Sequence, residues 1–298
     1  MTALLVPLDG AQGFAQRLLS HLPADLAEMS YRRFPDGETY VRYLTSPHAR
    51  DVILVAALDR PDAKTNQLLF AAAGARDLGA RRIGLIVPYL PYMRQDARFA
   101  DGEVITSTVF AALLSTHVDW LVTVEPHLHR WTALSQIYTI PTKVVHAAGT
   151  LADWIAANVE TPLLIGPDEE SQQWVARAAS RISSPHMVLT KQRHGDRSVS
   201  ISTPDLAAWK DHQPVILDDT ISSAHTMIET VKHVLAQGMA APVCCAVHGV
   251  YDDAALSALK QAGAARVVTS NTIDCETAEI DISGLVAAAL PDLAAPTD

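Results

Sequence analysis

Residues 215–229 read VILDDTISSAHTMIE. The first three residues are typical of a buried parallel strand, and Asp218 and Asp219 end this apolar run where the carboxyl edge of a sheet would lie. A short polar loop follows at 220–225, and the spacing of apolar residues from Thr226 onward predicts a helix. A strand, an acidic loop and a helix in this order predict a parallel α/β fold.

The loop has the composition of a phosphate-binding turn. A helix N-terminus offers unpaired N–H groups and a positive dipole end to an anion, and Ser222, Ser223 and Thr226 add hydroxyl donors. The two aspartates would face either sugar hydroxyls or a Mg²⁺ ion, so a ribose 5-phosphate group fits both halves of the loop. The alternative is a capped helix that follows a strand and carries surface aspartates.

Composition narrows the class of protein. The 298 residues are 49% hydrophobic and carry 23 Lys and Arg against 33 Asp and Glu, for a net charge of −10, which argues against nucleic acid or an anionic membrane as a partner. Cys244, Cys245 and Cys275 lack the spacing of metal ligands, so we interpret them as buried thiols in a reducing compartment. No apolar run approaches 18 residues, and we expect a cytoplasmic protein.

Two series of strands and helices follow one another along the chain. Buried-strand patterns lie at 51–57, 83–87 and 120–124, and again at 163–166, 215–217, 243–247 and 266–270. Helical patterns separate them, for example at 66–78, 104–115 and 172–181. We therefore predict an α/β protein of two similar domains, 1–143 and 144–298, each a mainly parallel sheet flanked by helices.

Two further segments have the composition of a nucleotide site. Residues 31–43 predict a hairpin whose tip carries Phe34, Asp36 and Glu38, although most hairpin tips are simple solvated turns. Residues 88–103, PYLPYMRQDARFADGE, follow a strand and so lie where open α/β sheets bind ligands. Their aromatic rings can enclose a base and their arginines can grip phosphate oxygens; a loop held by internal Arg to Asp pairs is the alternative.

Two other polar stretches leave alternatives open. His127 and His129 follow the strand at 120–124 and can bind a metal ion, but most such histidines are ordinary polar loop residues. Residues 191–197, KQRHGDR, predict a mixed-charge loop whose cations can close over a polyphosphate, or which is merely a solvated turn.

Six of these stretches together resemble the ribose-phosphate pyrophosphokinase family, also called PRPP synthetases. They are FPDGE at 34–38, PYLPYMRQDAR at 88–98, TVEPHLH at 123–129, GPD at 166–168, TKQRHG at 190–195 and VILDDTISSAHT at 215–226. They occur in the family's order across nearly the whole chain. The resemblance implies two domains of the phosphoribosyltransferase-like fold, with the tail from about residue 281 packing on the first domain.

The resemblance also implies an activity, in which diphosphate passes from ATP to the anomeric hydroxyl of ribose 5-phosphate to give PRPP and AMP, with Mg²⁺ as cofactor. It assigns Phe34, Asp36 and Glu38 to the ATP site of a neighbouring subunit, which requires a homo-oligomer that is at least a dimer. It assigns Arg94, Gln95 and Asp96 to the ATP pocket, His127 to the Mg²⁺ of Mg-ATP, Asp168 to ribose 5-phosphate and a second metal ion, Lys191 and Arg193 to the transferred group, Asp218 and Asp219 to the ribose hydroxyls, and Ser222, Ser223 and Thr226 to the 5-phosphate.

The chain departs from the family pattern in the phosphate loop. Residues 222–226 replace the usual Asp-Thr-Gly-Gly-Thr, so a third acid and two glycines are missing, while Glu125 stands in place of an Asp, and Glu170 and Ser171 in place of two glycines. A larger residue in a tight phosphate loop hinders close backbone approach. Two alternatives therefore remain: a phosphoribosyltransferase that uses PRPP, and a non-catalytic regulatory homologue of the family.

Overall fold

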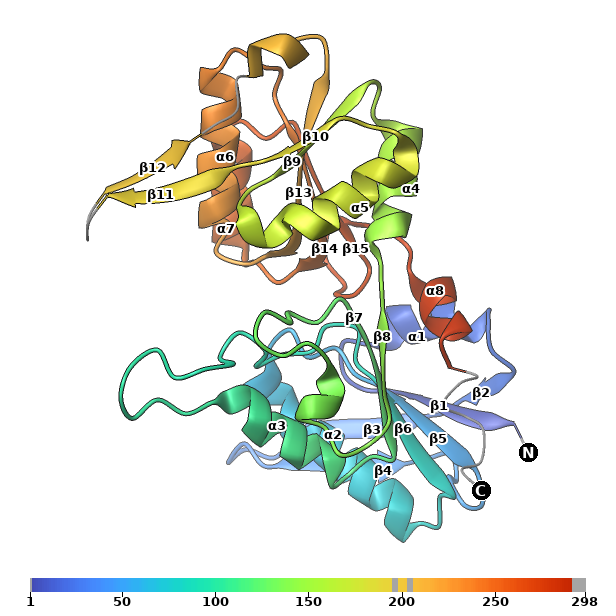
Figure 1. The fold of residues 1–298 in the computed structure, drawn as a ribbon. Helices are drawn as coiled ribbons and strands as arrows, with labels where there is room; N and C mark the ends of the chain where they lie inside the picture. Colours follow the sequence, from blue (N-terminus) through green and yellow to red (C-terminus); the bar gives the residue numbers. More distant parts are fainter. Residues whose placement is uncertain (1, 195–197, 203–205, 291–298) are drawn as a thin grey trace. The chain divides into compact units, whose positions relative to one another are not determined.

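The computed structural model describes residues 2–194, 198–202 and 206–290, and for Gln173, 190–194 and 198–202 it describes the backbone alone. The chain divides into two units: the first comprises Met1–Val145 with the segment that begins at Ser283, and the second comprises His146–Ile282. Each unit is a parallel sheet flanked by helices (Figure 1). This confirms the predicted fold class.

The sheet of the first unit is parallel throughout. Its strands, in spatial order, are β2 (Ala24–Leu26), β1 (Ala3–Pro7), β5 (Asp51–Val55), β6 (Arg82–Ile86), β7 (Trp120–Val124) and β8 (Thr142–Val145). Its helices are α1 (Gln12–Leu19), α2 (Pro61–Asp77), α3 (Thr106–Ser115) and α8 (Ser283–Ala288). The central strands are buried on both faces because helices cover both, which explains their continuous apolar runs.

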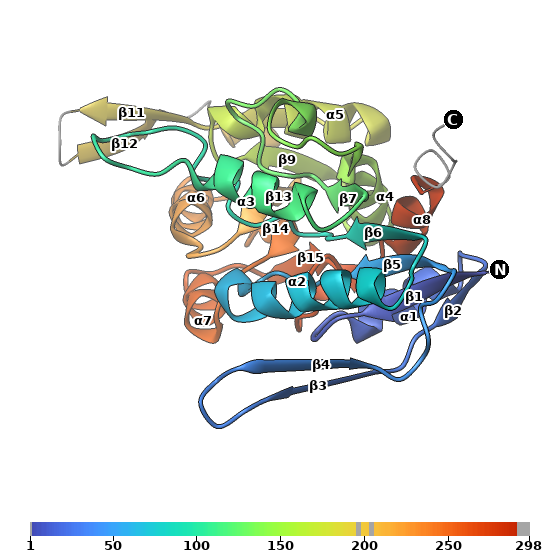
Figure 2. The ribbon, with the colours of Figure 1, turned by 90° about the horizontal axis from the view of Figure 1, so that it is seen from below.

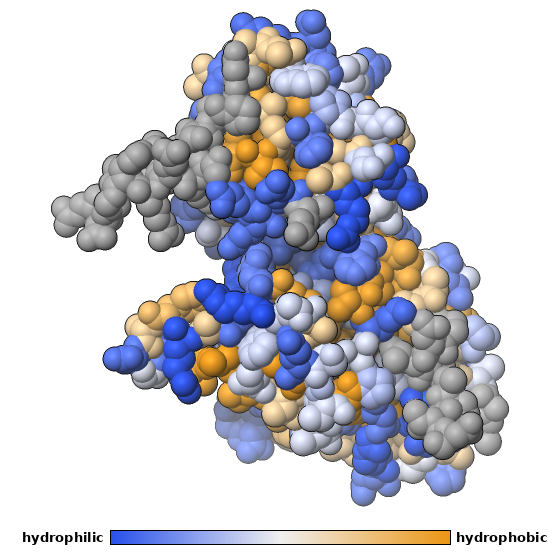
Figure 3. Space-filling view, in the orientation of Figure 1, coloured by the Kyte–Doolittle hydropathy of each residue, from blue (hydrophilic) through white to orange (hydrophobic). Residues whose placement is uncertain are grey.

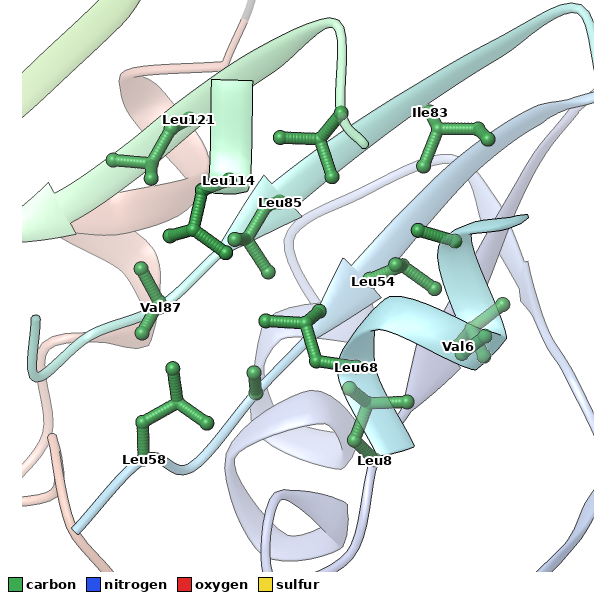
Figure 4. Packing of buried hydrophobic residues seen from close by; sticks show 14 of the residues in the cluster. Val6, Leu8, Leu54, Leu58, Leu68, Ile83, Leu85, Val87, Leu114 and Leu121 are labelled. Atoms are coloured by element: carbon green, nitrogen blue, oxygen red, sulfur yellow. The ribbon is translucent and has the colours of Figure 1, made fainter. Parts of the chain in front are cut away.

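The core of this unit lies between the sheet and helices α2 and α3. Leu54 and Leu85 from the strands pack with Leu68 of α2 and Leu114 of α3 (Figure 4). Ala71, Ala72 and Ala75 of α2 are fully buried, so this side of the helix can approach the sheet closely. Helices α1 and α8 pack against each other on the opposite face (Figures 1 and 2).

The predicted hairpin is confirmed. Strands β3 (Met29–Arg33) and β4 (Thr39–Tyr43) pair antiparallel, with Met29 opposite Tyr43 and Arg32 opposite Tyr40. One face of the hairpin packs on the core beside α2, where the Tyr43 hydroxyl donates a hydrogen bond to the Ala71 carbonyl at 2.7 Å. The hairpin therefore packs on the rest of the first unit through one of its faces.

The second unit repeats this architecture. Its strands, in spatial order, are β10 (His186–Val188), β9 (Pro162–Gly166), β13 (Gln213–Ile221), β14 (Val243–Gly249), β15 (Arg266–Ser270) and β16 (Ala278–Ile280), all parallel. Helices α6 (His225–Ala236) and α7 (Asp253–Gln261) pack on one face around Ile216 and Cys244. Helices α4 (Ala148–Asn158) and α5 (Gln172–Ile182) pack against each other on the other face (Figure 1).

Two predicted loops are partly strands. The strand predicted to end at 217 continues as β13 to Ile221, because Asp218 and Thr220 pair with Ala246 and His248 of β14. Part of the predicted loop 191–197 is also wrong: β11 (Thr190–His194) pairs antiparallel with β12 (Ser198–Ser202). In both cases cross-strand pairing outweighs a polar sequence of low strand propensity.

The surface is mixed in character. Figure 3 shows hydrophilic and hydrophobic side chains intermixed over each unit on the face in view. Exposed apolar residues include Phe70, Phe99 and Val109. No helix of the described residues has both the length and the hydropathy required to cross a membrane.

We expect Gly84→Ala to destabilise the first unit. Gly84 of β6 lies opposite Trp120 of β7, and a Cβ atom at Gly84 would lie 1.9 Å from Cζ2 of the buried indole. Because the indole cannot move without opening the core, the substitution should cost about 1–3 kcal/mol and lower the thermal midpoint measured by circular dichroism.

Gly74→Ala is the matched control. Gly74 lies inside α2, and its added Cβ would lie at an ordinary contact distance of 3.7 Å from Tyr43 Cε2. Because alanine is more favourable than glycine in a helix interior by about 1 kcal/mol, this variant should unfold at a higher temperature than the parent chain. An unchanged midpoint for Gly84→Ala would contradict the close packing of Trp120.

Candidate active site

The strand order of the second unit creates a site at the carboxyl edge of its sheet. The chain runs from β9 outward to β10 and returns to β13 on the other side of β9, so the strand order reverses between β9 and β13. Ligands of open α/β sheets bind at such a reversal. Asp168 lies two residues beyond the end of β9. Asp218 and Asp219 lie in the second half of β13.

The three aspartates are close enough to influence one another. Burial, and next the negative charges of Asp219 and Asp168, raise the pKa of Asp218 well above its usual value. The Asp219 N–H donates a hydrogen bond to Asp218 Oδ1 at 2.9 Å. Carboxyl oxygens at this edge can accept hydrogen bonds from sugar hydroxyls or bind a cation.

The phosphate loop follows directly. Ser222, Ser223 and Ala224 connect β13 to α6, and Ala224 takes the left-handed conformation with φ 59°. Ala224 precedes α6 and its side chain has no capping group, whereas Asp252 caps α7 by accepting from the Ala255 N–H at 2.8 Å. A helix N-terminus without a side-chain cap suits an anion. Thr226 lies in the first turn of α6 and is half-buried.

A second departure from the family pattern has a structural explanation. The Ser171 hydroxyl donates a hydrogen bond to the Asp168 carbonyl at 2.6 Å, which closes the short turn Glu169–Ser171. This hydroxyl would lie 2.3 Å from a Cβ atom at Gly166, so it fills the space beside that glycine. Ser171 therefore fixes the turn that presents Asp168.

In the first unit the predicted ATP residues on the loop after β6 have different surroundings. Arg94 is exposed, whereas Asp96 is buried and accepts hydrogen bonds from the Arg130 side chain at 2.9 Å and from its N–H at 3.2 Å. Gln95 is half-buried, and its side-chain oxygen accepts from the Thr106 hydroxyl at 3.2 Å. Arg94 is the one of the three that is exposed, while its two neighbours attach the loop to the unit.

Sequence reasoning missed Tyr92 and Arg130. Tyr92 has a positive φ of 63°, its ring packs 4.7 Å from Phe110, and its hydroxyl bonds to Asp62 in the first turn of α2. A bulky residue in this conformation is costly, and such strain is often found at functional sites. Its sequence signal was the PYLPY motif. Arg130 directly follows the predicted histidines. Its function in the loop became evident only from its hydrogen bonds to Asp96, which is far from it in the sequence.

The hairpin tip places its three predicted residues differently. The Phe34 N–H donates to the Glu38 carbonyl at 2.9 Å, so these two residues face each other across the turn. Asp36 Oδ1 accepts from the Glu38 N–H at 3.1 Å and shapes the turn, in which Gly37 has φ 93°. Phe34, Asp36 and Glu38 are all exposed.

His127 and His129 lie together after β7. Their nearest ring nitrogens are 3.1 Å apart and their ring centres 3.8 Å apart. Lys191 and Arg193 lie on β11, and their side chains are outside the described part of the chain. The structure thus brings Asp168, Asp218, Asp219 and the phosphate loop together in one unit, and it places Arg94, His127 and the hairpin tip in the other.

This site and fold define a class of protein. The family model of the phosphoribosyl transferase domain matches residues 133–283, which include the acids and the helix N-terminus at this strand reversal. The model of the N-terminal domain of ribose phosphate pyrophosphokinase matches residues 3–117.

The chain belongs to the ribose-phosphate pyrophosphokinase family. The ribose-phosphate pyrophosphokinase of Saccharolobus solfataricus is 31% identical over 295 residues, covering 96% of this chain and all of the relative. That of Methanobrevibacter smithii is 26% identical and covers 97% of this chain and all of the relative. The crystal structure of phosphoribosylpyrophosphate synthetase from Mycobacterium smegmatis shares the fold, with a TM-score of 0.85, 23% identity and 98% of each chain covered.

We expect Asp218→Asn to stabilise the chain at neutral pH in EDTA. Because the folded-state pKa of Asp218 is raised, the folded chain binds this proton more tightly than the unfolded chain. Folding therefore loses stability as the pH rises above 3.8, the usual value, towards the folded-state pKa. The neutral amide avoids this loss and keeps the acceptor for the Asp219 N–H. Its thermal midpoint should exceed that of the parent at pH 8, and the gap should shrink towards pH 4.

Asp153→Asn is the control of opposite sign. A hydrogen bond from Arg181 lowers the pKa of Asp153, so its charge stabilises the fold above pH 3.8 and this benefit is lost on acidification. The Asp153 variant should therefore be slightly less stable than the parent at pH 8. A gap for Asp218→Asn that is the same at every pH would show that charge is not its cause.

Proposed function

We propose that this chain is a ribose-phosphate diphosphokinase. The anomeric oxygen of ribose 5-phosphate forms a bond to the β-phosphorus of ATP, the bond from that phosphorus to the oxygen of the α-phosphate breaks, and the products are PRPP and AMP. The observation that carries the proposal is similarity over the full length to named ribose-phosphate pyrophosphokinases, together with an acid cluster and a helix N-terminus without a side-chain cap at one strand reversal.

The second unit would bind ribose 5-phosphate. The N–H groups at the start of α6, with the hydroxyls of Ser222, Ser223 and Thr226, suit the 5-phosphate. Asp218 and Asp219 suit the ribose hydroxyls, because their oxygens can accept hydrogen bonds from them. Such a site positions the sugar, which matters because phosphoryl transfer depends mainly on positioning and on charge neutralisation.

The first unit would bind ATP. Arg94 is exposed and can grip phosphate oxygens, and the exposed Phe34 ring can stack on a base. Glu38 lies opposite Phe34 and can accept a hydrogen bond from the nucleotide. Gln95 and Asp96 support the loop that carries Arg94.

The chemistry of the acid cluster suits Mg²⁺. Three carboxylates lie at one sheet edge, where burial and then the charges of Asp219 and Asp168 raise the pKa of Asp218, so a hard divalent cation with oxygen ligands would relieve their repulsion. Asp168 would hold one ion beside ribose 5-phosphate, and His127 would lie near the ion of Mg-ATP. When bound, the metal neutralises charge on the phosphates.

The proposal includes a homo-oligomer of at least two subunits. The hairpin packs on its own unit through one face, while Phe34 and Glu38 at its tip are exposed. An exposed tip of this kind supports the family's arrangement, in which it completes the ATP site of a neighbouring subunit.

The direct test is AMP formation from ribose 5-phosphate and ATP by the purified chain. We expect AMP and PRPP in equal amounts with Mg²⁺, none in excess EDTA, and recovery when Mg²⁺ is restored. Release of pyrophosphate from PRPP with a nucleobase, without AMP from the first reaction, would instead establish a phosphoribosyltransferase. Binding of both substrates without either product would establish the regulatory homologue.

We expect Lys191→Ala to remove turnover while leaving substrate binding nearly intact. A cation that stabilises charge on a transferred phosphoryl group contributes about 10³–10⁵ in rate, so kcat should fall by that order with little change in KM for either substrate. Steady-state kinetics of AMP release measures both constants.

Lys210→Ala is the matched control, since Lys210 is an exposed lysine that follows the short helix Leu206–Trp209. It should keep the parent rate. A Lys191 variant with the parent kcat would refute the assigned role.

A further inference from the structure

The β3–β4 hairpin has one covered face and one exposed face. Met29, Tyr31, Val41 and Tyr43 pack against the core of the first unit. Because side chains alternate along a strand, the residues between them point away from the core, and among them are Arg32, Phe34 and Tyr40. The exposed face therefore carries an arginine between two aromatic residues.

These three side chains contact one another. Arg32 Cζ lies 4.3 Å from the centre of the Phe34 ring and 4.5 Å from the centre of the Tyr40 ring. The two rings are 6.1 Å apart and perpendicular. Both distances from Arg32 Cζ to the ring centres are within the range of a favourable cation–π contact. The backbone supports the arrangement, since Arg32 is paired with Tyr40 and Phe34 is hydrogen-bonded to Glu38.

We propose that Arg32 is a positioning residue for the nucleotide: it covers one face of Phe34 and holds the ring so that the other face can stack on the base of ATP. This inference rests on the proposed function, in which Phe34 contacts ATP. The family resemblance gives no role to Arg32. The ring of Tyr40 contacts the guanidinium of Arg32.

The physical reason is preorganisation. Phe34 is 36% exposed at a hairpin tip, where a ring without a neighbour would rotate freely and would have to be ordered when the base binds. A planar guanidinium on one face removes that freedom in advance, and it leaves the base to fill the other face. Arg32 would therefore act on affinity for the base and not on the chemical step.

The experiment measures binding of a Mg²⁺-bound, non-hydrolysable ATP analogue by calorimetry, so it does not depend on turnover. Arg32→Ala should weaken binding roughly two- to five-fold, the range expected of an exposed cation–π contact. Inorganic tripolyphosphate, which has the phosphate chain without a base, should bind the variant and the parent equally. In the AMP assay, KM for ATP should rise by the same factor with kcat and KM for ribose 5-phosphate unchanged.

A thermodynamic cycle separates positioning from direct contact. In a Phe34→Ala background, Arg32→Ala should change nucleotide affinity no further, because the ring through which it acts is gone. Arg42→Ala removes an exposed charge from the same face, opposite Ser30, and should bind the nucleotide like the parent.

Several results would overturn the inference: equal weakening of tripolyphosphate and nucleotide, the same loss in both backgrounds, no loss at all, or a parent chain that does not bind the nucleotide. A parent that binds the nucleotide but releases no AMP would refute the proposed activity, and the affinity measurements would still decide the role of Arg32.

Discussion

The pairing of β13 with β14 beyond the last apolar residue is the constraint on which the site depends. Asp218 and Thr220 remain in register with Ala246 and His248, so the acids sit on a regular strand and not on a loop. Burial, and next the charges of neighbouring acids from which it cannot move away, raise the pKa of Asp218. A rigid element that concentrates like charge is matched to a ligand that supplies hydrogen-bond donors or a cation.

The two units share one topology but differ in the charge at the carboxyl edge of the sheet. In each, a hairpin leaves the chain between the second and third strands of the parallel sheet: β3–β4 in the first unit and β11–β12 in the second. The edges differ in charge, because Ala56 and Ala57 follow β5, whereas the strand at the equivalent place, β13, continues into Asp218 and Asp219. At this place in the sheet the first unit thus has two alanines where the second has an acid pair.

Sequence patterns predicted the buried parts best. The strands at 120–124 and 266–270 have the predicted bounds, since apolar runs between helices allow no other interpretation. The patterns missed β8, α4 and the end of β13, where the chain is short, rich in alanine or polar, and where distant partners decide the conformation. For the same reason the sequence indicated Asp96 but not its partner Arg130, and Phe34 but not its neighbour Arg32. In each pair the two residues come together only in the folded chain.

The substituted phosphate loop is less disruptive than its sequence indicates. His225, at one of the two replaced glycines, is the first residue of α6 and is exposed, so its side chain does not disturb the packing of the unit. Ala224, at the other, holds the left-handed conformation that glycine adopts freely, at a cost of roughly 1–2 kcal/mol. Its Cβ is buried beside Ile221 and Met227, which offsets part of that cost. The backbone path of a phosphate loop is therefore kept by packing where glycine would keep it by flexibility.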